Sequence, residues 1–258
     1  IDANDYSYTP GDNTFNGQVT GSALTDFYLG YESQFFQDNG RSFALREDSP
    51  SLYVQDDWKV SRQLTLNLGL RWEPWLPPID LSNSRTAFVP GVESTVAPNA
   101  PTGLLFPGDP GIPQSVFKQN WKDFAPRVGF AWNVGADQKT VVRAGYGIFY
   151  SFPEGLLYQR TEATQPTDLY LSIPAPQSFT DPYLNYPGGD PFPRGHVSPS
   201  GFPSYHFLTP VSGGMLDPSS KVGYTQNWNF TLEHQFAKDT ALSVAYVGNH
   251  AIDIMGSR

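Results

Sequence analysis

The sequence contains no cysteine and little charge. Charged residues make up only 16% of its 258 residues, whereas a soluble globular protein usually carries about 25%. Without thiols the chain can form neither disulfides nor thiolate metal sites. Aromatic residues nevertheless reach 15%. Low charge with many aromatic residues favours a β-barrel whose outer wall faces lipid over a cytosolic protein.

Basic residues and long apolar runs are also scarce. Lys and Arg number 16 against 25 Asp and Glu, giving a net charge of −9. Because nucleic acid binding needs clustered Lys and Arg, we expect no nucleic acid partner. No apolar run approaches the roughly 18 residues of a membrane helix. The first residues, 1–5, lack the features of a signal peptide, so we expect either that one was removed or that the chain begins inside a larger protein.

Strict alternation of apolar and polar side chains is the strongest pattern in the sequence. From Leu64 to Glu73, every second residue is large and apolar, and the residues between them are small or polar. The same period of two recurs at 224–236 and, more weakly, at 127–132, 141–150 and 242–246. A further strand is expected at 51–60, with a start near Arg41 as the alternative, although Pro50 interrupts that longer strand. These segments are predicted strands with one apolar face.

The lengths of the connections alternate as well. Short segments separate the strands within each pair, and segments of about 50 and 70 residues separate the pairs. We therefore predict an all-β fold: an antiparallel transmembrane β-barrel segment of about six strands, with short periplasmic turns and long extracellular loops. Residues 1–258 then form part of one barrel domain without a plug, with outer loops at 1–40, 74–121 and 151–221 and hairpins at 41–73, 122–150 and 222–250.

Three sets of side chains follow from this arrangement. Tryptophans near strand ends are expected at the membrane interface, although a soluble β-sandwich would bury them in its core: Trp58, Trp72, Trp75, Trp121, Trp132 and Trp228. Charged residues opposite the apolar face are expected to line a lumen and to contact a plug or substrate, or only one another: Arg71, Glu73, Arg127, Arg143 and Glu233. Tyrosines of the longest loop are expected either to contact a ligand or to pack within the loop: Tyr158, Tyr170, Tyr183, Tyr186 and Tyr205.

Motifs for catalysis and metal binding are not recognisable. The four histidines lack metal-ligand spacing, and no nucleophile elbow or nucleotide-binding loop occurs. We expect no enzyme activity, no cofactor and no metal site, although Asp2, Asn4, Asp5, Asp12 and Asn13 could bind calcium without EF-hand spacing. A short helical turn ending at Gly30 is expected from Ala23 onward.

Several motifs resemble a known family. Residues 53–59 and 64–74 resemble a hairpin of TonB-dependent receptors, and 124–132 with 143–150 resemble the next hairpin. Residues 20–27 and 245–249 add two further similarities. Together they resemble the Oar-like branch, whose members often carry a carboxypeptidase-regulatory-like domain ahead of the plug.

The resemblance implies a barrel of about 22 strands in the outer membrane of a Gram-negative-type bacterium. A plug would close it, and an inner-membrane TonB complex would energise uptake of a large or scarce nutrient. Its partners would be the lipid bilayer, the rest of the barrel, the plug, the TonB complex and an extracellular ligand.

The sequence lacks a recognisable plug, TonB box or aromatic-terminated final strand. Since the smallest membrane barrels have about eight strands, we expect a middle piece of a barrel. An outer-surface adhesion module and a soluble β-rich enzyme remain the alternatives.

Overall fold

The computed structural model describes residues 2–5, 9–137, 139–153, 158, 164–211 and 213–256. Two compact units divide the chain. The strand unit comprises 48–77, 119–153 and 220–258, and the loop unit comprises 1–47, 78–118 and 154–219.

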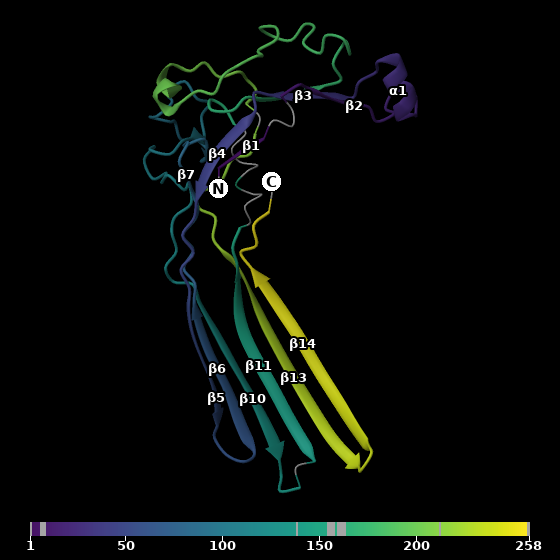
Figure 1. Ribbon diagram of the computed structural model, residues 1–258, viewed down its shortest axis with the longest axis vertical. Helices are drawn as coiled ribbons and strands as arrows, with labels where there is room; N and C mark the ends of the chain where they lie inside the picture. The colour runs from purple at the N-terminus through teal and green to yellow at the C-terminus, as the bar shows by residue number, and fades with distance from the viewer. Residues whose placement is uncertain are drawn as a thin grey trace. The chain divides into compact units, whose positions relative to one another are not determined.

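The strand unit is a single antiparallel sheet of six strands, drawn as long adjacent arrows in Figure 1. Its spatial order is β14-β13-β11-β10-β6-β5. Short turns join the members of each hairpin. The strands are β5 (Leu52–Lys59), β6 (Leu64–Trp72), β10 (Phe124–Val134), β11 (Thr140–Ser151), β13 (Gly223–Ala237) and β14 (Thr240–Ile252).

The pairing register gives this sheet two chemically different faces, since directly paired residues lie on the same face. Leu66 pairs with Phe130, which in turn pairs with Ala144, and Ala144 pairs with Phe230. On the opposite face, Asn67 pairs with Gly129. The apolar positions of all six strands therefore combine into one face, with Asp56, paired with Leu68, as its acidic exception.

No described residue of the strand unit covers the apolar face of its sheet. Val54, Val128, Phe230 and Tyr246 are each between 45% and 66% exposed. A soluble sheet would bury such residues against a second layer. An uncovered apolar face suits a sheet that lipid covers.

All six strands predicted from alternation are present. The possible start of the first strand near Arg41 is wrong. Residues Arg41–Arg46 form a separate strand, β4, which pairs with β1 and β7, and β5 begins only after Pro50 at Leu52.

The loop unit has short strands that the sequence did not reveal. One small sheet has the order β1-β4-β7, a second β12-β3-β2 and a third β8-β9. The expected helical turn is confirmed as α1, Ala23–Leu29, which the Ser22 side chain caps and which ends at Gly30 with φ of 74°. The remaining elements are β1 (Asp2–Asp5), β2 (Asp12–Thr14), β3 (Gln34–Asp38), β7 (Ile79–Asp80), β8 (Ala87–Phe88), β9 (Leu104–Leu105), β12 (Tyr170–Pro174) and a 3-10 helix at Pro199–Ser204.

Two apolar clusters pack the loop unit. Phe35, Leu169, Leu171 and Tyr183 form the first. Ala97, Leu104, Phe106 and Phe202 form the second. Each draws on segments distant in sequence, so the long connections make a packed structure. Among the described residues, no helix is long and apolar enough to cross a membrane.

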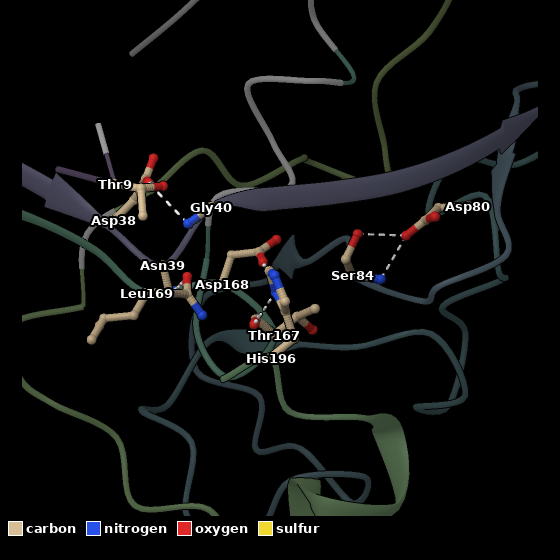
Figure 2. Close-up of polar contacts among 10 residues, drawn as sticks. All are labelled: Thr9, Asp38, Asn39, Gly40, Asp80, Ser84, Thr167, Asp168, Leu169 and His196. Atoms are coloured by element: carbon tan, nitrogen blue, oxygen red, sulfur yellow. Dashed lines mark hydrogen bonds and ion pairs between the residues drawn. The ribbon is translucent and has the colours of Figure 1, made fainter. Parts of the chain in front are cut away.

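Buried aspartates organise the backbone between these clusters. Asp80, fully buried, accepts hydrogen bonds from the Ser84 N–H and hydroxyl at 2.6 and 2.5 Å, and Asp38 accepts one from the Gly40 N–H at 2.9 Å (Figure 2). Asp109, 3% exposed, accepts from the N–H groups of Thr95, Val96 and Phe106 and from the Ser94 hydroxyl. Such carboxylates satisfy loop N–H groups that have no strand partner.

Asp109 should be essential to the loop that it organises. Burial raises its pKa, but the hydrogen bonds from Phe106, Ser94 and Val96 hold the pKa below its ordinary value. We expect Asp109→Ala to lower the local stability of residues 94–109 by about 3 kcal/mol, because several charge-assisted hydrogen bonds are lost. Hydrogen exchange of the Val96 and Phe106 amides measures this. Glu93→Ala, at an exposed position in the same loop, is the control, and equal protection in both variants would contradict the assignment.

Glu32 should make the loop unit sensitive to pH. It is 5% exposed, and neither carboxylate oxygen has a hydrogen-bond partner among the described residues. Burial, followed by the nearby charge of Asp12, raises its pKa to about 7. Its stabilising contribution is complete below about pH 4.5 and is lost as the pH rises through 7.

Urea unfolding in detergent micelles, followed by tyrosine near-UV CD, should therefore give a loop unit less stable at pH 8 than at pH 5, by on the order of 2 kcal/mol. Glu32→Gln should remove most of this difference, and Glu93→Gln should retain it. A pH dependence unchanged by Glu32→Gln would show that other groups cause it.

Candidate site on the polar face of the six-stranded sheet

The five charged residues expected to face a lumen belong to the strand unit. Arg71, Arg127, Arg143 and Glu233 lie on its strands opposite the apolar residues, and Glu73 directly follows β6. The structure brings four of them together as two ion pairs. The Arg71 guanidinium lies 2.7 Å from Glu73 Oε1, and Arg143 Nη1 lies 2.7 Å from Glu233 Oε2.

Arg127 is held differently. Its guanidinium carbon lies 4.5 Å from the centre of the Phe149 ring. Among the described residues, no carboxylate lies within ion-pair distance of Arg127, unlike its two neighbouring arginines. Of the three arginines on this face, Arg127 is therefore the one whose positive charge no described carboxylate compensates.

A hollow of about 360 Å³ lies on the polar face beside Arg127. Amide side chains and glycines form most of its lining: Gln55, Asn67, Asn227, Asn229, Gly69, Gly129, Gly145 and Gly147. A second, smaller hollow of about 190 Å³ adjoins Tyr53, Arg71 and Arg127. Side-chain amides donate and accept hydrogen bonds, so this surface suits polar groups.

The glycines that line the hollow have no Cβ and so leave space above the backbone of the sheet. A Cβ at Gly147 would lie 3.0 Å from Phe149 Cε2 and 3.4 Å from Arg127 Cγ, and one at Gly145 would lie 3.1 Å from Asn229 Nδ2. Glycine at these two positions therefore leaves these side chains room that a Cβ would narrow by a few tenths of an ångström. Sequence reasoning missed Phe149 and the asparagines, although an aromatic residue at a polar-face position, between Gly147 and Ser151, was a detectable departure from the pattern.

The tyrosines of the longest loop pack within the loop unit. Tyr158, Tyr183 and Tyr205 are at most 7% exposed. The Arg85 guanidinium lies over the Tyr158 ring at 4.6 Å, and the hydroxyls of Tyr183 and Tyr205 donate to Gln37 and Gln165. Tyr170 stacks on Phe36, and Tyr186 contacts Tyr183. The three buried rings pack within the loop unit, and ligand contact by these tyrosines stays a prediction.

The tryptophans expected at a membrane interface divide into two groups. Trp58, Trp121 and Trp132 are between 45% and 53% exposed, and Trp72 stacks on Trp121 and donates to its carbonyl oxygen.

The other two depart from the expectation. Trp75 is only 3% exposed, and its backbone pairs with that of Asn120. Trp228 lies in the interior of β13, where its ring covers Gly248.

A histidine–carboxylate pair in the loop unit joins an exposed histidine, His196, to a buried aspartate, Asp168. His196 Nδ1 lies 2.7 Å from Asp168 Oδ1, and Asp168 is 1% exposed (Figure 2). In the described part of the chain, no group of three or more His, Cys, Asp or Glu side chains could hold a metal ion. The side chains of Asp2, Asn4 and Asp5, considered above for calcium, lie outside that part.

Comparison with known proteins adds one finding. The family model described as "Outer membrane beta barrel domain" matches residues 1–258. No curated protein and no solved structure matches the chain. The family places the chain in the outer membrane of a Gram-negative-type bacterium, which agrees with the uncovered apolar face of its sheet. With the whole chain matched, it belongs to the outer membrane beta barrel domain family.

Proposed function

We propose that the chain is a segment of an Oar-like TonB-dependent receptor that takes up a large or scarce nutrient. The motifs at 53–59, 64–74, 124–132 and 143–150 support this, since they coincide with the hairpins β5–β6 and β10–β11. In this role the chain supplies wall and outer loops to the transporter and carries out no chemistry of its own.

The polar face is the observation that carries the proposal. It combines paired charges, amide side chains and a hollow, which suits a water-filled or plug-filled lumen better than a packed core. The apolar face then contacts the lipid bilayer. The loop unit, formed by the long connections, is the part exposed to an extracellular ligand.

The sheet edges support a larger barrel. Within the described residues, β5 and β14 each pair on one side only. Unpaired backbone groups are costly in a bilayer. The proposal therefore assigns the rest of the barrel to these edges, and contacts with the plug and the TonB complex to the parent chain.

Growth of the host tests the proposal. A strain without the gene for this chain should lose growth on one class of scarce nutrient in a panel of iron chelates, glycans and peptides. A protonophore should produce the same loss in the parent strain at a dose that spares growth on abundant small nutrients, because TonB-dependent uptake needs the proton gradient. Complementation with the gene is the control.

The same strains separate the proposal from the adhesion alternative. Loss of surface attachment with unchanged growth on every nutrient would favour an adhesion module and contradict uptake.

A further inference from the structure

Arg127 differs from the other arginines of the polar face in how its charge is compensated. Arg71 and Arg143 each lie 2.7 Å from a glutamate oxygen. Among the described residues Arg127 makes no ion pair, and its guanidinium lies over the Phe149 ring. A guanidinium that no carboxylate of the described residues compensates is available to an anionic group from outside the chain.

The Phe149 ring and Gly147 position the Arg127 guanidinium. Gly147 pairs directly with Arg127 across β10 and β11, and its missing Cβ leaves room for both side chains. A guanidinium stacked on a ring keeps its N–H groups free in its own plane. Those groups match the two oxygens of a carboxylate.

The rest of the hollow suits a peptide. Asn227 and Asn229 are two residues apart on β13, about 7 Å along the strand. This spacing equals that of alternate residues in an extended peptide. Their side-chain amides make no hydrogen bond to the described protein, and they offer the donor and acceptor that a peptide group needs. The glycines that line the hollow let the backbone of a bound peptide approach the sheet closely.

We propose that this hollow binds an acidic peptide, with its carboxylate on Arg127 and its backbone on the asparagines. The inference rests on the proposed function in one respect, that the polar face lines a lumen open to peptide. Arg127 supplies charge-assisted hydrogen bonds, and Phe149 positions it.

Titration of the full chain in detergent micelles tests the site. The probe is the peptide acetyl-Gly-Asp-Gly-amide, and its partner acetyl-Gly-Asn-Gly-amide differs only in lacking the charge. The readout is the NMR signal of the Arg127 Nε–H group, together with the binding isotherm. We expect the aspartate peptide to shift this signal and to bind at least about tenfold more tightly than the asparagine peptide.

Two charge-removing variants provide the matched comparison. Arg127→Gln should weaken binding of the aspartate peptide at least about tenfold. Lys59→Gln removes one positive charge from the same face, four residues from Gln55 along β5, and should change binding less than about twofold. Far-UV CD confirms that both variants remain folded.

Equal binding of the two peptides, or equal losses in the two variants, would overturn the proposal. These outcomes concern binding alone, so they leave nutrient uptake untouched. Conversely, the chain could bind the peptide while deletion of its gene does not impair growth. That result would contradict nutrient uptake and support the peptide site.

Discussion

Register is the constraint on which the rest of the structure depends. Side chains alternate along a strand, so a slip of one residue would move every apolar side chain to the opposite face. Pairings such as Leu66 with Phe130 and Ala144 with Phe230 keep six strands in phase. The result is a largely apolar face that no described residue of the strand unit covers, which is stable only where lipid replaces water.

The same register determines which residues lie side by side on the polar face. Alignment places Arg127 against Gly147 and Asn229 against Gly145, so long polar side chains meet residues without a Cβ. Space for a hollow arises in this way without any interruption of the strands. Ion pairs neutralise Arg71 and Arg143, and the absence of a carboxylate near Arg127 in the described chain leaves a single directed charge.

The sequence predicted the sheet well because its pattern is local. Alternation from Leu64 onward specifies both the strand and its faces. The loop unit could not be predicted, because strands of two to six residues pair across long separations, as Tyr170 does with Asp38. The pairing of Trp75 with Asn120, 45 residues away, could not be predicted for the same reason. The sequence predicted which charged residues lie on the polar face. It could not predict which of them form ion pairs, because that depends on the register between strands.

The orientation of the two faces is tested most directly by two single-cysteine variants, which the cysteine-free chain permits without background. Asn229→Cys and Phe230→Cys are neighbours on β13 that point to opposite faces. Each would carry a nitroxide spin label in liposomes, and its collisions with oxygen and with a water-soluble nickel chelate would be measured. The account predicts oxygen access at 230 and chelate access at 229. Equal access at both positions, or the reverse order, would contradict a sheet with one face in lipid.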